Sequence, residues 1–334
     1  MAAGRFVIAR PRARMNGEAP PWPVEYVLPL RWEDDRGSGE MSRYLREIAG
    51  LVEVTVVDGS DDPLFTAHES AWPWVRHIRP EWPGRNGKAR GAMTGLSRAR
   101  HETVIIADDD VRYDVAALQA IIQRLAVFDL VRPQNYFSPL PWHARWDSGR
   151  ILLNRALGGD YSGTVALRRG ALPDRGYDTD VLFENFQLER TVRAHGGNVD
   201  VARDILVRRI PPSTGRFWDQ RVRQAYDGFA QPVRLIRELA LLPLCVFAFA
   251  RRRWGVLAGA ACAIIATAEI GRRRGDGTAH FPMSGDLWAL VWTAERSITI
   301  WIALIQRLRG GVPYRGERFI RAASPTPRQG RRRP

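Results

Sequence analysis

The feature that most constrains the fold is the short apolar run Thr103–Ala107, which is followed at once by three carboxylates, Asp108–Asp110. The length and β-branched content of this run are typical of a buried strand. Adjacent carboxylates repel one another and lose solvation, and a divalent cation with oxygen ligands offsets that cost. Ligands of open α/β sheets bind at the carboxyl ends of strands. The pattern therefore predicts a metal site. A simpler alternative is an acidic turn in which Asp110 or Asp114 caps a helix over 114–126.

Strand-like and helix-like segments alternate through the first two thirds of the chain. This alternation predicts an α/β fold with a mostly parallel sheet and covering helices. Residues 133–147 are aromatic-rich and have no clear period, so we expect irregular structure there. The expected strands are 26–30, 52–57, 103–107, 128–132, 162–168 and 199–207, and the expected helices are 39–49, 87–100, 114–126 and 183–195.

The charge of the chain is unevenly divided. Residues 1–233 hold 32 basic and 30 acidic side chains, whereas residues 234–334 hold 18 basic and 6 acidic ones. The nearly neutral front part argues against a nucleic-acid partner. Both cysteines, Cys245 and Cys262, lie in apolar runs, so no disulfide framework is expected. Residues 1–23 are rich in Arg and Pro, lack an apolar signal segment and are expected to be a disordered leader.

Apolar segments dominate the chain after Pro232. The runs 239–250, 254–270 and 287–305 are separated by arginine triplets at 251–253 and 272–274. A bilayer core needs about 20 helical residues, so the first two runs are short for membrane spans. A tight hairpin, tilted spans and helices lying in the membrane interface all remain open, and so does a buried helical subdomain. The expected divisions are 1–23 leader, 24–232 α/β domain, 233–310 membrane-associated helices and 311–334 basic tail.

Three short motifs follow one another near strand ends: Asp58-Gly59-Ser60-Asp61, Asn86-Gly87-Lys88 and Asp108-Asp109-Asp110. Lys88 is the only lysine in the chain. In this order and spacing they resemble the nucleotide-sugar half of a family 2 glycosyltransferase, which implies a GT-A fold. That family has a second aspartate before the Asp-Gly-Ser turn, where this chain has Val57.

The resemblance continues downstream and covers about residues 26–232. Gly163–Arg169 is similar to the acceptor-side strand of the family, and Phe183–Leu188 stands where the family has Glu-Asp before a helix. Asp219–Gln224 resembles the Gln-x-x-Arg-Trp motif of membrane-bound members. Two departures matter: the usual base aspartate is Asn185, and the tryptophan of that motif is Gln224.

The resemblance implies a nucleoside-diphosphate sugar as the donor and Mg²⁺ or Mn²⁺ as the cofactor. Asp58 would hold the base or ribose, and Lys88 would lie near the nucleotide. Asp108 would face the ribose and diphosphate, with Asp108 and Asp110 as metal ligands. The metal would neutralise the leaving diphosphate.

The resemblance also implies that Arg221 and Arg223 help to hold the phosphates, with Gln220 and Arg221 as substrate-binding residues and Arg223 as a catalytic one. Ordinary ion pairing or lipid headgroup contact is the alternative for both arginines. An amide cannot act as a base, so Glu184 is the first candidate to take the acceptor proton. Asp180 and Asp160 come next, and Asp160 also counts among the substrate-binding candidates. A plain acidic residue in a first helical turn is the alternative for Glu184.

The reaction implied is inverting transfer of a sugar to a lipid, a lipid-linked acceptor or a cell-envelope glycan. We expect a protein of the cell inner or plasma membrane whose catalytic domain is cytoplasmic. Two other classes stay open. A membrane-bound, metal-dependent nucleotidyltransferase would also use a carboxylate cluster, and a non-catalytic membrane scaffold would tolerate Asn185.

Overall fold

The computed structural model describes residues 20–324. Most of the predicted leader and the last ten residues of the predicted tail lie outside the described residues.

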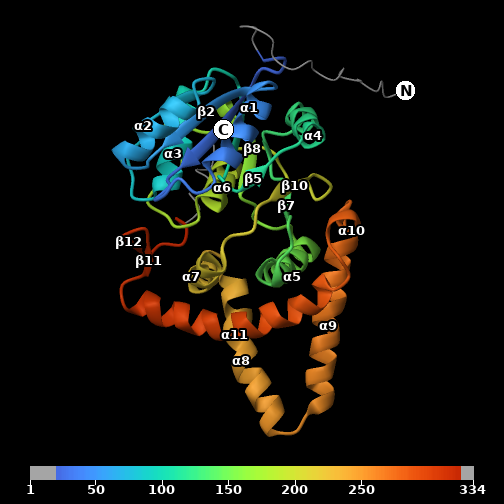
Figure 1. The fold of residues 1–334 in the computed structure, drawn as a ribbon. Helices are drawn as coiled ribbons and strands as arrows, with labels where there is room; N and C mark the ends of the chain where they lie inside the picture. Colours follow the sequence, from blue (N-terminus) through green and yellow to red (C-terminus); the bar gives the residue numbers. More distant parts are fainter. Residues whose placement is uncertain (1–19, 325–334) are drawn as a thin grey trace, which may run out of the picture.

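A seven-stranded sheet forms the centre of the α/β part (Figure 1). The strands β1, β2, β3 and β4 run parallel to one another, and β8 is antiparallel to both β4 and β6. The prediction of a mostly parallel sheet is confirmed. In spatial order the strands are β3 (Arg76–Ile78), β2 (Glu53–Asp58), β1 (Val24–Leu30), β4 (Thr103–Ala107), β8 (Thr164–Arg168), β6 (Leu130–Val131) and β9 (Val199–Asp200).

Helices cover both faces of this sheet because its strands are apolar on both sides. Along β1, Tyr26 and Leu28 belong to one buried cluster with α1 (Ser38–Ala49) and α4 (Val115–Leu125). Val27 points the other way, into a second cluster with the helices α3 (Gly87–Arg98) and α6 (Glu184–Ala194). Alternate strand residues face opposite sides, so an unbroken apolar strand requires a layer on each side.

A second, three-stranded sheet continues from the end of β4. It consists of β5 (Val111–Arg112), β10 (Leu206–Arg209) and β7 (Gln134–Phe137), with β10 between the other two. The segment 199–207, expected as one strand, is therefore two strands in different sheets. The turn between them, Ala202–Ile205, is what separates the pairing partners.

Two helices differ from the sequence expectation. Helix α2 (Asp62–Ala71) follows the Asp58–Asp61 turn, where Asp61 accepts a hydrogen bond from the Leu64 amide and caps it. Helix α5 (Trp142–Leu157) occupies part of the segment expected to be irregular. Its apolar period is diluted because polar side chains such as Asp147 and Arg155 are buried on it and find partners in other elements.

The C-terminal region is helical. Helices α8 (Pro232–Ala250) and α9 (Trp254–Arg273) form a hairpin that projects away from the α/β part, and α11 (Gly285–Leu308) crosses its base (Figure 1). Among the described residues, α9 and α11 are long and apolar enough to cross a membrane. The remaining elements are α7 (Thr214–Ala225), α10 (Gly277–His280) and the 3-10 helices Arg169–Ala171 and Tyr226–Ala230.

After α11 the chain returns to the α/β part through β11 (Val312–Tyr314) and β12 (Glu317–Phe319). The backbone amides of Leu182 and Phe183 donate hydrogen bonds to the carbonyls of Arg321 and Ala322 at 3.2 and 3.0 Å. This contact joins the end of the helical region to the loop that leads into α6.

Candidate active site

The three aspartates lie where β4 ends, at the same sheet edge as the carboxyl ends of β1 and β2. The backbone amide of Asp108 donates to the carbonyl of Gly163 at 2.8 Å, which extends the pairing of β4 with β8 by one residue. A Cβ at Gly163 would lie 2.7 Å from Asp108 Oδ2, so any side chain there would displace the Asp108 carboxylate. Glycine at this position therefore leaves room for the carboxylate of Asp108.

Lys88 bridges two of the predicted site residues. Its Nζ atom lies 2.5 Å from Asp108 Oδ1 and 2.5 Å from Glu184 Oε1. Burial by itself would lower the pKa of Lys88, but the charges of Asp108 and Glu184 raise it well above the ordinary lysine value. The single lysine is therefore a fixed positive charge between β4 and the start of α6. The structure brings these three predicted residues together.

Asn86 explains why α3 and α6 begin side by side. Its side-chain oxygen accepts from the amides of Lys88 and Ala89 and caps α3. Its side-chain nitrogen donates to the carbonyls of Val181 and Leu182, in the loop before α6, at 2.8 and 3.2 Å. One buried amide thus fixes the two helix starts that carry Lys88 and Glu184.

Arg209 is a member of the site that the sequence did not reveal. Its Nε lies 2.9 Å from Asp110 Oδ2, and its Nη2 lies 3.4 Å from Asp108 Oδ2. Strand β10 positions it, because Arg209 is the register partner of Val111 on β5. The missing signal is the antiparallel pairing of two short strands that are about a hundred residues apart in the chain. No local pattern in the sequence indicates that these two strands pair.

Asp110 keeps one oxygen without a hydrogen-bond partner. Its Oδ1 atom is buried and unsatisfied among the described residues. Burial, opposed by Arg209 and reinforced by Asp108 and Asp109, raises the pKa of Asp110 to about 6. A buried carboxylate oxygen that lacks a donor is what a divalent cation satisfies. The residues present therefore fit a metal bound by Asp110 and Asp108, although Arg209 already contacts Oδ2 of each.

Asp109 has a different partner from its neighbours. Its Oδ2 atom accepts a hydrogen bond from the indole nitrogen of Trp32 at 2.6 Å. The backbone amide of Trp32 donates to Ser60 Oγ at 2.9 Å, so the loops that follow β1, β2 and β4 are linked. Trp32 was not singled out from the sequence, and an isolated aromatic residue after a strand carries no specific signal.

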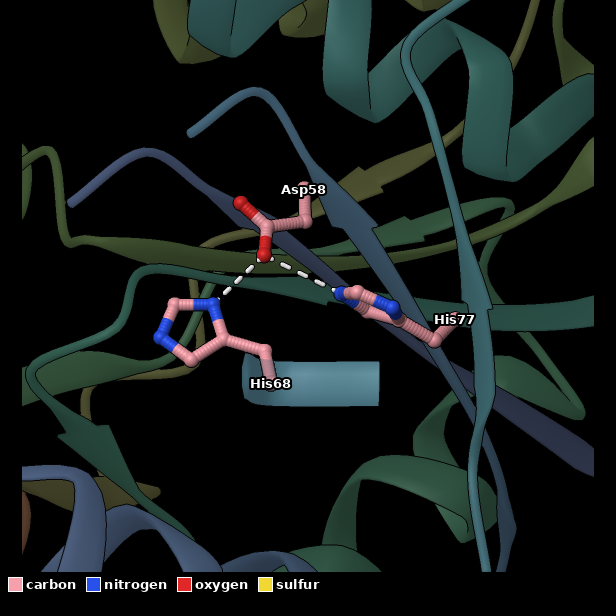
Figure 2. Close-up of side chains that lie close together, drawn as sticks. All are labelled: Asp58, His68 and His77. Atoms are coloured by element: carbon pink, nitrogen blue, oxygen red, sulfur yellow. Dashed lines mark hydrogen bonds and ion pairs between the residues drawn. The ribbon is translucent and has the colours of Figure 1, made fainter. Parts of the chain in front are cut away.

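Asp58 lies at the end of β2 with its side chain fully buried. Figure 2 shows both of its histidine partners pointing at the same oxygen: His68 Nδ1 and His77 Nε2 lie 2.6 and 3.0 Å from Asp58 Oδ2. The other oxygen accepts from the amide of Ser60. Burial alone would raise the pKa of Asp58, but the hydrogen bonds from His68 and His77 hold it well below the usual range.

This cluster comes from three separate elements, since His68 lies on α2 and His77 on β3. Its three ligand atoms lie within 4.8 Å of one another, a set that a transition-metal ion accepts. The hydrogen bonds to Asp58 Oδ2 already account for the convergence of the two rings. All the oxygens of Asp58 thus have partners within the protein.

Other predicted residues lie outside the Lys88 cluster. Arg221 is buried, and its Nη2 lies 2.8 Å from Asp147 on α5, while its Nη1 lies 3.5 Å from Glu295 on α11. These contacts correspond to the ordinary ion pairing left open by the sequence. Arg223 lies over the ring of Tyr314, with 4.5 Å from Cζ to the ring centroid. Gln220 is half-buried on the same helix, α7.

The two alternative carboxylates are also placed apart. Asp160 is buried in the loop before β8, where Oδ1 lies 2.5 Å from Arg150 Nη1 and accepts from Asn154 at 2.7 Å. Asp180 accepts from the backbone amide of Arg85 at 2.9 Å. Both hold loops together in this structure.

Asn185, which stands where the family has its base, donates from its side-chain nitrogen to the Ser162 carbonyl at 3.0 Å.

This sheet order, with an antiparallel strand after the aspartates, is the GT-A fold, and that prediction is confirmed. The structure is similar to the mannosyltransferase PcManGT from Pyrobaculum calidifontis in complex with GDP-Man and Mn²⁺, with 19% identity and a TM-score of 0.52. The match covers 84% of this chain and 87% of that one. No protein-family model and no curated protein matches the sequence.

Two more distant similarities were found. Mannosyl-3-phosphoglycerate synthase from Rubrobacter xylanophilus is 17% identical over 63% of this chain and 75% of that one, with a TM-score of 0.38. Glucosyl-3-phosphoglycerate synthase from Mycobacterium tuberculosis, in complex with Mn²⁺, UDP and glucosyl-3-phosphoglycerate, is 20% identical over 56% and 69%, with a TM-score of 0.36.

Proposed function

We propose that this chain is a metal-dependent glycosyltransferase that moves a sugar from a nucleoside-diphosphate sugar to an acceptor at a membrane surface. The observation that carries this proposal is the convergence of Asp108, Asp110, Lys88 and Glu184 at the carboxyl edge of a GT-A sheet. The structurally similar mannosyltransferase, whose complex contains GDP-Man and Mn²⁺, supports the same class of donor and metal.

Each residue of the cluster has a separate role in this proposal. Asp110 and Asp108 would hold Mg²⁺ or Mn²⁺, which would supply positive charge to neutralise the leaving diphosphate. Lys88 keeps a positive charge beside the phosphates. Glu184 accepts the proton of the acceptor hydroxyl as that oxygen attacks the anomeric carbon, and the bond from this carbon to the diphosphate oxygen breaks. Attack from the face opposite the leaving group inverts the anomeric centre.

The metal role is tested by turnover of a panel of nucleotide sugars by the purified protein with saturating Mn²⁺. Asp110→Ala should lower turnover by about a hundredfold or more, because several kcal/mol of charge stabilisation are lost. Asp114→Ala is the matched control: Asp114 caps α4 through the Ala117 amide, outside the cluster, so activity should be retained. Undiminished turnover by Asp110→Ala would refute the metal role.

The α8–α9 hairpin supports a membrane-side acceptor. Its side chains are apolar yet exposed: Leu244, Phe247, Phe249, Trp254 and Val256 are each more than half exposed. Contiguous exposed apolar surface of this kind marks an interaction site, and arginines and tryptophan beside it suit lipid headgroups. The described segments therefore favour a bilayer as the partner, and an amphiphilic acceptor would reach the site from that surface.

Helix α11 has the length of a membrane span, but one of its faces packs against the α/β part. Arg296, in the middle of its apolar run, is buried, and its Nη1 donates to Gln224 O at 3.0 Å and to Asp227 Oδ1 at 3.1 Å. Its exposed face carries Ile298, Trp301 and Ile305. We propose that α11 lies in the membrane interface while the hairpin dips into the bilayer. This arrangement would place the α/β part at a membrane surface, and we propose that this is the cytoplasmic surface of the cell membrane.

The two cysteines of the chain allow a direct test, since Cys245 on α8 and Cys262 on α9 are both exposed. A nitroxide is attached to either cysteine, with the other replaced by serine, and collision with oxygen and with a water-soluble nickel complex is measured. Vesicles containing anionic lipid should raise oxygen collision and lower nickel collision at both sites. A label at Ser97→Cys, exposed on α3, should not respond. Equal responses at all three positions would contradict hairpin insertion.

A further inference from the structure

Asp108 lies between two basic side chains. Lys88 contacts its Oδ1 at 2.5 Å, and Arg209 contacts its Oδ2 at 3.4 Å. Arg209 also pairs with Asp110 Oδ2 at 2.9 Å through both Nε and Nη2. The guanidinium thus bridges the two carboxylates that we assign to the metal.

The fold positions Arg209 through its backbone, and Gly163 leaves room for its guanidinium. The amide of Ile210, the next residue, donates to the carbonyl of Asp110 at 2.7 Å, which ties the end of β10 to the aspartate turn. On the other side, a Cβ at Gly163 would lie 3.2 Å from Arg209 Cζ. Arg209 is one-quarter exposed, so one side of it remains open to solvent.

A guanidinium and a divalent cation that bind the same two carboxylates compete with each other, because each neutralises the negative charge that attracts the other. Charge-assisted hydrogen bonds of this kind are stronger than neutral ones. The metal therefore binds the free protein at the cost of the Arg209 contacts. A diphosphate offers the guanidinium a new planar, bidentate anionic partner, which removes this cost.

We propose that Arg209 is an internal competing cation that couples metal binding to binding of the donor diphosphate. This inference rests on the proposed function and adds to it a positioning residue and a binding order. In the free protein Arg209 holds the carboxylates of Asp108 and Asp110 and weakens metal binding. When a nucleoside diphosphate binds, Arg209 turns to its phosphates and releases the oxygens. Because coupling is reciprocal, the metal strengthens diphosphate binding by the same factor.

The test measures Mn²⁺ binding to the metal-free protein by the electron paramagnetic resonance signal of free Mn²⁺. Without nucleotide, Arg209→Gln should bind Mn²⁺ about tenfold more tightly than the wild type, because a competitor has been removed. Arg209→Lys keeps the charge and should stay nearer the wild type. Arg208→Ala is the matched control, since the Arg208 side chain donates to the Ser138 carbonyl instead. Circular dichroism melts verify folding, and Arg209→Met replaces the glutamine variant if that one unfolds.

A second arm repeats the titrations with saturating UDP or GDP. Nucleotide should tighten Mn²⁺ binding by a smaller factor in Arg209→Gln than in the wild type. Unchanged or weaker Mn²⁺ binding by the folded variant without nucleotide would overturn the proposal, and so would an unchanged coupling factor. Neither arm requires sugar transfer. If the variant binds Mn²⁺ more tightly but no nucleotide sugar is consumed, the proposed function fails while the competition by Arg209 stands.

Discussion

At the scale of single residues, sugar transfer requires a carboxylate in place of the usual base aspartate, and we propose Glu184 for this role. Glu184→Gln removes a proton acceptor but keeps the size of the side chain. We expect kcat for sugar transfer to fall by about 10²–10⁴, the usual contribution of general-base catalysis. Asp180→Asn is the comparison, because Asp180 accepts from the Arg85 amide whereas Glu184 contacts Lys88. If Glu184 is the base, the Asp180 variant should change kcat little, and if Asp180 is the base, the two effects should be reversed. Full activity in Glu184→Gln would remove it from the mechanism.

The Asp58 cluster gives a prediction of pH-dependent stability. Because His68 and His77 hold the pKa of Asp58 below its usual value, ionised Asp58 stabilises the fold above the ordinary aspartate pKa. This stabilisation is lost as the pH falls through the lowered value. Asp58→Asn should therefore reduce the free energy of unfolding by about 2–4 kcal/mol at pH 7.

The measurement for the Asp58 cluster is urea unfolding of both proteins from pH 3 to 7. The difference between them should be full at pH 7 and shrink below about pH 4, where the unfolded chain binds the proton. A difference that stays constant across this range would contradict an ionised, histidine-held Asp58.

The sequence could predict the site residues that lie next to a recognisable strand or helix start. Lys88, Asp108 and Glu184 belong to such local patterns, and the structure brings them into contact. It could not predict Arg209, His68 or His77, because they arrive through strand register and through an unrecognised helix. The phosphate-binding role of Arg221 and Arg223 stays a prediction. The contacts of Arg221 are with α5 and α11 instead.

At the scale of elements, α5 joins the sheet to the C-terminal helices through close backbone contact. A Cβ at Gly149 would lie 2.5 Å from the backbone nitrogen of Ala289 on α11, and one at Gly271 on α9 would lie 1.9 Å from the Leu152 carbonyl oxygen. Helices approach this closely only where a side chain is absent. The sequence predicts irregular structure over 133–147, where α5 begins, because its buried polar residues hide the helical period. This close packing of helices was therefore not expected.

Gly149→Ala tests the joint between α5 and α11. Overpacking should lower the free energy of unfolding by about 1–3 kcal/mol, because backbone atoms rather than a flexible side chain must move. Gly259→Ala on α9 is the control: no atom lies within 4 Å of its Cβ position, and alanine favours a helix. Chemical unfolding in a neutral detergent checks both variants. Equal stability of the two would argue against tight packing at Gly149.

At the scale of the whole molecule, the helical region contacts the α/β part at two places. The base of the hairpin packs on α5, and the chain that follows α11 returns to the loop before Glu184 through the carbonyls of Arg321 and Ala322. A membrane that orients the hairpin would therefore also orient the entrance to the site.

The proposed reaction breaks the bond between the anomeric carbon of the sugar and the diphosphate oxygen. The most direct measurement uses the nucleotide sugar that the purified protein turns over. It is hydrolysed in ¹⁸O-labelled water with Mn²⁺ and no acceptor, and the position of the ¹⁸O in the products is determined. Our account predicts unlabelled nucleoside diphosphate and ¹⁸O at the anomeric carbon of the released sugar, with both products lost in Asp110→Ala. Nucleoside monophosphate and sugar phosphate, with ¹⁸O on phosphorus, would show nucleotidyl chemistry and contradict the account.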